Sequence, residues 1–438
     1  MSGLLDPYNA SNGAWTKKEA THLLWRRAAG ASTAEIERAV REGMKATVDR
    51  LVTGQAESEE FAATEKLLHR SALKSDNIGS LKNWWLFRFL ESANPLAEKM
   101  ALLWHNHFAT SNVKVRSTGK MNDQHALIRK QALGNFADLF RAMARDVAML
   151  IWLDGNANRK RHPNENFARE VMELFALGVG NYSETDIKEA ARAFTGWHVR
   201  KDEFWFNRIQ HDKGVKKVLG QSGNFTGDDI LEICLAQKSC ARFVASKLAG
   251  AFVKPNPESE LLEALAERIR FHRFEMAPVM KELLSSRAFY SAGSRQSLIK
   301  SPVEFVVGAF RTSGGRAKLG ECVQLMTDLG QSLFEPPTVK GWEGGRLWIN
   351  SATMLQRANF VSQLTSGKRF GNLGDQLPRK GSADERVTGH LDLLLAGKVS
   401  PATRRELTKY ERGARGTAKE RNEGLVQLIM TMPEYQLI

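Results

Sequence analysis

Residues 164–197 read NENFAREVMELFALGVGNYSETDIKEAARAFTGW, and this stretch shows the helical pattern that dominates the chain. Its apolar side chains recur at three- and four-residue spacing, which predicts a helix over 166–177. Asn164 is suited to cap the start of that helix. A second helix is expected over 185–197. The residues that form the first apolar stripe are Phe167, Val171, Leu174 and Phe175.

The same periodicity extends in both directions from this stretch. Toward the N-terminus, helices are expected at 15–29 and at 32–41, the second ending at Gly43. Four more are expected at 81–91, 95–108, 123–133 and 136–152. Toward the C-terminus, the pattern returns at 228–235, 239–252, 258–271, 276–285, 302–312, 322–329 and 351–364, and again at 387–395 and 401–410.

One short region departs from the helical pattern. Phe204, Trp205 and Phe206 precede a polar turn at 212–214 and then Val215 and Val218, which predicts a small β-hairpin over 204–219. We therefore expect a mainly α protein, a large multi-helix domain with a small β-hairpin. Within one continuous body we expect an N-terminal helical lobe over 1–219, a second over 220–366, and a polar, basic helical segment over 367–438.

Composition narrows the class of protein. The 438 residues are 42% hydrophobic and 26% charged, which is enough to build a full core. No apolar run reaches the length that spans a bilayer, and residues 1–15 show no export signal, so we expect a cytoplasmic protein. Three cysteines, at positions 234, 240 and 322, do not suggest a disulfide framework.

The net charge of +14 is compatible with acidic partners, but it is weaker evidence for them than a binding motif would be. Basic stretches at 114–120, 159–161 and 404–421 contain few aromatic residues, and no nucleic-acid-binding signature is present, so we do not expect nucleic acid. Walker, dinucleotide-binding and Gly-x-Ser-x-Gly motifs are also missing, which disfavours nucleotide hydrolysis, Rossmann redox chemistry and α/β-hydrolase chemistry.

Several sequence words carry a resemblance to a known family. They include WHNHF at 104–108, PNENFARE at 163–170, MELF at 172–175, GNYSE at 180–184, EAARAFTGW at 189–197, KGW at 340–342 and WINSA at 348–352. The chain resembles domain of unknown function 1800, a bacterial family without an established activity. The resemblance extends over nearly the whole chain, since HLL at 22–24 and RRA at 26–28 are similar to the opening helix of that family.

The resemblance implies two further properties. Members of the family often look exported, whereas this chain shows no signal. They are also often encoded beside a sulfatase-like companion family, domain of unknown function 1501, which is the partner that the resemblance implies.

Two histidines and a glutamate form the first candidate site. His105 and His107 are candidate catalytic residues and metal ligands, because imidazole is a common ligand of transition metals. On a helix, residues two apart point about 200° from each other, so both reach one ion only where the helix has ended. Glu170 falls at the edge of the apolar stripe. It either pairs with Arg192 or another arginine, or lies opposite His107 to share a divalent metal or act with it as a general base.

A second candidate metal site lies in the loop before the quoted stretch. Asp154, Asn156, Asn158 and Glu165 occupy positions 1, 3, 5 and 12 of an EF-hand-like spacing. Position 6 is Arg159, where an EF-hand requires glycine, and three further basic residues follow it. A polar loop between helices is the alternative interpretation.

Aromatic and basic residues complete the candidate site. Trp104, Trp197, His211 and Trp342 are the candidate substrate-binding residues, and Arg192 is a candidate catalytic residue. Two classes of function stay open: a metal-assisted enzyme that uses His105, His107, Glu165 and Glu170 in a helical cleft, and a non-catalytic scaffold whose motif residues only pack helices.

Overall fold

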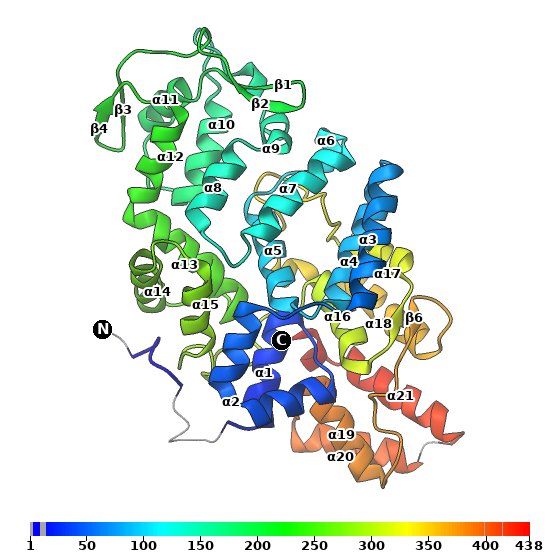
Figure 1. Ribbon diagram of the computed structural model, residues 1–438. Helices are drawn as coiled ribbons and strands as arrows, with labels where there is room; N and C mark the ends of the chain where they lie inside the picture. The colour runs from blue at the N-terminus through cyan, green and yellow to red at the C-terminus, as the bar shows by residue number, and fades with distance from the viewer. Residues whose placement is uncertain (1–2, 9–14, 398, 414) are drawn as a thin grey trace.

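Helices build almost the entire molecule in the computed structural model, which describes residues 3–8, 15–397, 399–413 and 415–438 (Figure 1). The expected fold class is confirmed: the described part is mainly α, with three small antiparallel sheets of two strands each. Most of residues 1–15, on which the expected absence of an export signal depends, lie outside the described residues. No helix of the described chain is long and apolar enough to cross a membrane.

The N-terminal part of the described chain forms seven helices. They are α1 (Lys17–Ala28), α2 (Thr33–Thr53), α3 (Glu59–Lys74), α4 (Ile78–Glu91), α5 (Pro95–His107), α6 (Asn112–Val115) and α7 (Thr118–Lys130). Ser32 and Glu35 form a capping box at the start of α2. Gly43 interrupts the helix where its end was expected, with a backbone conformation outside the helical region. It adopts φ 81° and kinks the helix, which then continues to Thr53.

The middle of the chain is more broken than the periodicity suggested. The single helix expected over 136–152 is two helices, α8 (Phe136–Ala144) and α9 (Val147–Trp152), because the Asp146 side chain accepts a hydrogen bond from Met149 N–H at 2.8 Å and starts a new helix. A 3₁₀ turn, η2 (Gly155–Ala157), follows. Then α10 (Glu165–Glu170) runs directly into a π-helix, η3 (Val171–Leu177), before α11 (Glu184–Ala193).

The expected hairpin over 204–219 is wrong in its pairing. Strand β2 (Glu203–Phe206) pairs with the preceding strand, β1 (Trp197–Arg200), and β3 (Lys216–Val218) pairs with the following strand, β4 (Gln221–Gly223). The two expected strands therefore belong to two different hairpins. Lys201 and Asp202 both have positive φ, 53° and 60°, as a two-residue hairpin turn requires. Trp197 therefore belongs to a strand, and the helix expected to reach it ends at Ala193.

The C-terminal half is helical again. It contains α12 (Gly227–Ala236), α13 (Lys238–Phe252), α14 (Ser259–Phe271), α15 (Met276–Leu284), α16 (Pro302–Ser313), α17 (Leu319–Asp328), η4 (Gly345–Trp348), α18 (Ser351–Thr365), α19 (Ala383–Leu395), α20 (Pro401–Gly413), α21 (Ala418–Thr431) and η5 (Pro433–Gln436). Strands β5 (Arg316–Ala317) and β6 (Gly371–Asn372) pair beside α18. Cys234, Cys240 and Cys322 are buried and free.

Distant parts of the chain pack on one another. Helix α1 contacts both α5 and α16. The last residue, Ile438, exchanges two backbone hydrogen bonds with Leu298, at 2.8 and 3.2 Å. The C-terminal end therefore lies against the middle of the chain (Figure 1). The division at 219/220 and 366/367 stays a prediction.

Candidate functional site

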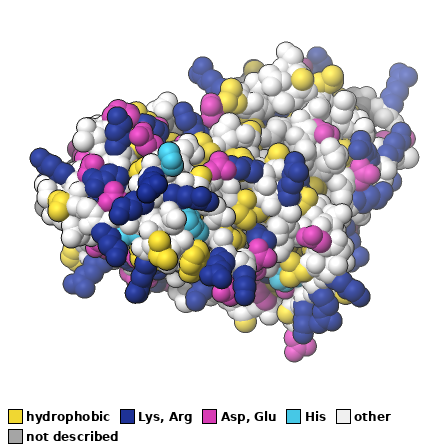
Figure 2. All heavy atoms as spheres, turned by 90° about the horizontal axis from the view of Figure 1, so that it is seen from above, with side chains coloured by type: hydrophobic (Ala, Val, Ile, Leu, Met, Phe, Trp, Pro, Cys, Tyr) yellow, Lys and Arg dark blue, Asp and Glu magenta, His cyan; other side chains and the backbone are white. Residues whose placement is uncertain are grey.

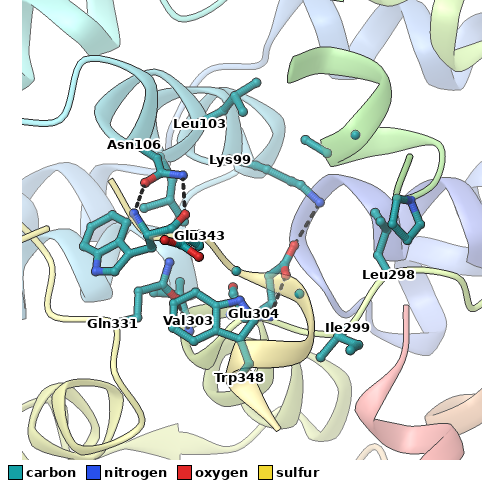
Figure 3. Close-up of a pocket in the computed structure, with 18 of the residues that line it drawn as sticks. Lys99, Leu103, Asn106, Leu298, Ile299, Val303, Glu304, Gln331, Glu343 and Trp348 are labelled. Carbon is teal, nitrogen blue, oxygen red and sulfur yellow. Dashed lines mark hydrogen bonds and ion pairs between the residues drawn. The ribbon is translucent and has the colours of Figure 1, made fainter. Parts of the chain in front are cut away.

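A cavity of about 1200 Å³ lies where α5, α13 and α16 meet the segments 296–301 and 340–348 (Figure 3). Its wall includes residues from Ala28 to Leu437, so it forms only when most of the chain has folded. Ligand pockets typically enclose about 300–1,000 Å³. The cavity is large enough for a sizeable organic molecule.

Asn106, near the end of α5, holds one wall of the cavity in place. Its Oδ1 accepts a hydrogen bond from Trp342 N–H at 2.6 Å, and its Nδ2 donates one to Trp342 O at 3.2 Å (Figure 3). Gly341 has φ 80°, and a Cβ at this position would lie 2.2 Å from Asn106 Oδ1. Only glycine fits this close approach without strain.

Apolar side chains form most of the cavity surface. Leu102 and Leu103 come from α5, and Leu298 and Ile299 come from the segment that precedes α16. Trp348 closes the wall below Glu304 in Figure 3. A surface of this kind favours a ligand with an apolar body, because each buried Å² of apolar area contributes roughly 25 cal/mol.

Cations outnumber carboxylates among the lining residues. Lys99 Nζ lies 2.9 Å from Glu304 Oε1 and reaches it across the cavity (Figure 3). Lys247 also lines the cavity, and burial lowers its pKa. The exposed rim carries two further cations and one carboxylate, namely Lys340, Arg346 and Glu343. Four cations against two carboxylates give the lining a positive balance.

The pKa of the Lys99–Glu304 pair reflects its burial. Desolvation lowers the pKa of Lys99, partly offset by the charge of Glu304. Desolvation alone would raise the pKa of Glu304, but Lys99 and hydrogen bonds from Ser301 bring it below its ordinary value. On each partner, burial disfavours the charged form and the opposite charge of the other partner favours it.

His105 lies on the face of α5 that points toward an aromatic cluster. Its ring centroid is 5.4 Å from Trp85, 5.6 Å from Phe334 and 5.7 Å from Trp342. Its Nε2 is buried and has no hydrogen-bond partner in the described structure. Burial lowers the pKa of His105 to about 3, so the ring is neutral.

His107 lies in a different cluster. Its Nε2 is 2.9 Å from the carbonyl oxygen of Phe175, and its ring packs against Trp104 and Phe136. Burial and the nearby charge of Lys247 lower the pKa of His107 to about 3. The two imidazoles therefore do not face one common point, and their use in catalysis or as metal ligands stays a prediction.

Glu170 is nearly buried, at 9% exposure, at the junction of α10 and the π-helix. Desolvation raises its pKa, and the neighbouring charge of Glu173 raises it further. Lys340, on the cavity rim, and Arg169 act in the opposite direction. No ion pair of Glu170 is found among the described residues. Among the residues proposed for the site or lining the cavity, the charge of Lys340 acts on Glu170, whereas His107 does not.

Arg192 is engaged elsewhere, so the expected pairing of Glu170 with Arg192 is wrong. Its guanidinium lies 2.8 Å from both Asp212 and Glu189. His211 beside it is held by Thr195, whose carbonyl oxygen is 3.0 Å from His211 Nδ1. These contacts tie α11 to the turn after β2, away from the cavity.

The three tryptophans proposed to bind substrate have different positions. Trp104 is fully buried and donates its Nε1–H to Ala132 O at 3.0 Å. Trp197 is buried against Phe167 and Phe194. Of the four expected substrate-binding residues, Trp342 alone lines the cavity. The assignment of the others stays a prediction.

Three of the four EF-hand-like side chains have partners within the protein. Asp154 forms an ion pair with Lys114 at 2.8 Å, and Asn156 Oδ1 accepts from Val199 N–H at 2.6 Å. Asn158 Oδ1 accepts from Asn164 N–H at 2.9 Å, and Glu165 is exposed. Within the described ranges, no group of three or more His, Cys, Asp or Glu side chains is placed to hold a metal ion.

The surface around this loop is basic but mixed. Arg159, Lys160 and Arg161 are exposed beside the β1–β2 hairpin, where Lys160 N–H donates to Gln210 O at 2.8 Å. Figure 2 looks down on this end of the molecule and shows acidic side chains distributed among the Lys and Arg side chains. This mixture shows no continuous basic track.

Sequence reasoning missed Lys99 and Glu304. Lys99 lies three positions before Leu102 on α5, and Glu304 lies two positions after Pro302 at the start of α16. Both read as ordinary helix-surface charges, and their pairing joins residues 205 apart. The available signal was the Ser301-Pro302-x-Glu304 capping box, which explains Glu304 locally and hides its second partner.

Comparison with known proteins gives one match. A family model described as protein of unknown function (DUF1800) matches residues 22–437. Searches among curated proteins and among solved structures found nothing similar.

Proposed function

The chain belongs to the protein family of unknown function DUF1800, and from this premise we propose that it binds an amphipathic organic anion in the central cavity. The observation that carries the proposal is the wall of that cavity. It combines an apolar surface with a surplus of cations, and ligand pockets are typically apolar with a few placed polar groups.

The motif residues support the same location. Asn106 of WHNHF and Trp342 of KGW, 236 residues apart, are joined by two hydrogen bonds at the cavity wall. Gly341, between Lys340 and Trp342, makes this approach sterically possible. These two motifs therefore meet at the cavity wall.

An enzyme that acts on the bound anion is a second candidate. Glu170 is a carboxylate with a raised pKa, as a general acid or base requires. The charge of Lys340, on the cavity rim, acts on it. A metal-assisted reaction through His105, His107, Glu165 and Glu170 has less support. The two histidines lie in different aromatic clusters, and Glu165 is exposed. The non-catalytic scaffold, the cytoplasmic location and the DUF1501 companion stay predictions.

The test uses a ligand series in which only the head group changes. Binding of decyl phosphate, decanoate and decanol is measured by isothermal titration calorimetry with the full chain, below their micelle-forming concentrations. We expect saturable binding of the anions and weaker binding of the alcohol. Mass spectrometry of the recovered ligand, for the wild type and Glu170→Gln, reports conversion and tests the enzymatic candidate.

A variant that fills the cavity provides the decisive comparison. Leu103→Trp places a larger side chain on the wall, and Leu67→Trp makes the same change at a position that is 68% exposed on α3. The first variant should lose anion binding and the second should keep it. Equal binding by both variants, or no saturable binding of any anion, would exclude the cavity as the site and favour the scaffold.

A further inference from the structure

The segment 296–301 forms the cavity wall on one face and covers buried cations on the other. Ser297, Leu298, Ile299 and Ser301 line the cavity, whereas Lys300 does not. Backbone hydrogen bonds fix the segment against the C-terminal end, with Lys300 N–H donating to Gln436 O at 2.8 Å. This pairing turns the Lys300 side chain away from the cavity and into the protein.

Lys300 is a buried cation without a salt bridge in the described chain. It is 2% exposed, and its ammonium lies 3.6 Å from the ring centroid of Tyr435 and 5.5 Å from that of Trp25. Aromatic faces stabilise a cation by much less than the cost of removing the charge from water. When Lys300 is protonated, its own contacts therefore do not balance its positive charge.

Two buried arginines lie behind the same segment. Arg26 is 0% exposed and donates from Nη2 to Ser297 Oγ at 2.9 Å, while its Nε and Nη1 have no partner among the described residues. Arg357 is 1% exposed and donates to Lys300 O at 2.9 Å and Gln436 Oε1 at 3.0 Å, with Nε left unpartnered. Both guanidiniums thus retain N–H groups that no described residue accepts from.

Among the described side chains, the carboxylate of Glu304 is the one that acts on all of these cations. The charge of Glu304 acts on Arg26, Lys99, Lys300 and Arg357. Four cations against one carboxylate leave a surplus of three positive charges when all are protonated. A surplus of this kind in a protein interior destabilises the fold unless an anion offsets it.

We propose that the head group of the ligand is a phosphoryl group, seated at Ser297 on the cavity face of the segment, with Arg26, Lys300 and Arg357 behind that segment. This inference rests on the proposed function, because it places one end of the ligand in the same cavity. A phosphate monoester carries close to two negative charges at neutral pH, which matches the surplus better than the single charge of a carboxylate. Its alkyl or aryl body then extends along Leu103 and Leu298 toward Trp348.

The central test removes the unpaired cation. Lys300→Met should lower the affinity for decyl phosphate at least about tenfold and leave the affinity for decanol unchanged. The same change should raise the unfolding midpoint of the ligand-free protein by about 2 °C or more, because an apolar side chain replaces an unbalanced buried charge. A purely structural lysine would show a lower midpoint on substitution.

Lys82→Met is the matched control. Lys82 is also buried, but its ammonium is paired with Glu335. This variant should lower the midpoint and leave phosphate affinity unchanged. If Lys300→Met binds decyl phosphate as the wild type does, the subsite is wrong and the surplus is offset in another way.

A second variant supplies the missing anion within the chain. Ser297→Asp places a carboxylate beside Arg26 Nη2, on the cavity face of the segment. It should raise the midpoint and abolish decyl phosphate binding even if Lys300→Met fails to fold. A lower midpoint with unchanged binding would contradict the proposal.

Two further arms separate the sources of phosphate and the two proposals. Inorganic phosphate is titrated alone and in competition with decyl phosphate. Lys300-dependent binding of both compounds, with the ester binding more tightly, supports a phosphate ester. Binding of inorganic phosphate alone overturns the amphipathic ligand but keeps the subsite. Decanoate and decyl phosphate binding that depends on Leu103 and not on Lys300 would overturn the subsite and keep the proposed function.

Discussion

At the scale of single residues, Lys300 shows how burial and charge act together on one group. Burial and the positive charge of Arg357 lower its pKa, Glu304 opposes the shift, and the resulting pKa is about 7. The rings of Tyr435 and Trp25 complete its surroundings. The ordinary pKa of lysine is near 10.4. Between these two values the unfolded chain binds a proton that the folded chain has released.

This difference predicts a pH dependence of stability. Because the unfolded state binds more protons between about pH 7 and pH 10, the free energy of unfolding should rise with pH over this range. The contribution of Lys300 approaches about 1.4 kcal/mol per pH unit. Urea titrations of the phosphate-free wild type and Lys300→Met, at several pH values, isolate this contribution as the difference between the two proteins.

The stability difference between Lys300→Met and the wild type should itself change with pH. The advantage of Lys300→Met over the wild type should be largest below pH 7 and should shrink as pH rises. A difference between the two proteins that is constant from pH 6 to pH 9 would mean that Lys300 keeps an ordinary pKa. Lys82→Met, whose cation is paired with Glu335, serves again as the control.

At the scale of elements, α5 has different roles on its different faces. One face carries Lys99 and Asn106 to the cavity. His105 packs against Trp85 and Phe334 on another face, and His107 packs against Trp104 and Phe136 on a third. The π-helix η3 contributes the carbonyl of Phe175, which lies 2.9 Å from His107 Nε2. A π-helical turn leaves carbonyl groups outside the usual α-helical pairing, and His107 Nε2–H donates to one of them.

These contacts predict opposite effects for two similar substitutions. His107→Phe should lower the free energy of unfolding by about 1–3 kcal/mol, because the buried Phe175 carbonyl loses its donor. His105→Phe should change it by less than about 1 kcal/mol or raise it, since it removes a buried Nε2 that has no described partner. Urea denaturation of both variants measures the difference. Equal losses would contradict these different roles, and metal content that falls only when these histidines are replaced would support the metal interpretation.

At the scale of the whole molecule, the cavity joins the parts of the chain that the sequence suggested as lobes. Lys99 of the first part pairs with Glu304 of the second, and Leu437 of the last part lines the same cavity. Lys17 and Asp392 form a further ion pair between the two ends, at 3.3 Å. Such contacts favour cooperative unfolding of the three parts.

Calorimetry of the full chain tests this cooperativity. We expect one main unfolding transition that moves to higher temperature as a whole when decyl phosphate is added, because the ligand contacts several parts of the chain and binds only the folded state. Separate transitions, of which one does not move with the ligand, would instead support independent lobes with boundaries near 219 and 366.

Local signals account for the success of the fold prediction. Helix caps and apolar spacing are read within a few residues, so the helical body and its family could be predicted. The breaks were harder to predict. Asp146, which starts α9, and the Lys201–Asp202 turn of the first hairpin are single polar features within apolar patterns, and they redirect the chain through side-chain and backbone geometry.

The candidate site was predictable only in part. Trp342 was expected at the site and lines the cavity, and Glu170 lies within electrostatic reach of Lys340 on its rim. Arg192 and His211 were expected there as well, but Asp212 and Thr195 hold them elsewhere. No sequence signal showed that Lys99 pairs with Glu304 or that Lys300 is buried, because a charge on a helix or a loop looks the same whether its partner is water or another buried group.

By itself, the sequence determined the helical class, the family, and the residues that cap and pack each helix, because these depend on neighbours close along the chain. The tertiary structure alone decided which residues meet. The Asn106–Trp342 hydrogen bonds, the Lys99–Glu304 pair and the cations gathered behind Ser297 and Ser301 join positions 200 or more apart in several cases. Burial then sets the energies of these contacts, because a low dielectric strengthens the interaction between charges and raises the cost of each unpaired donor.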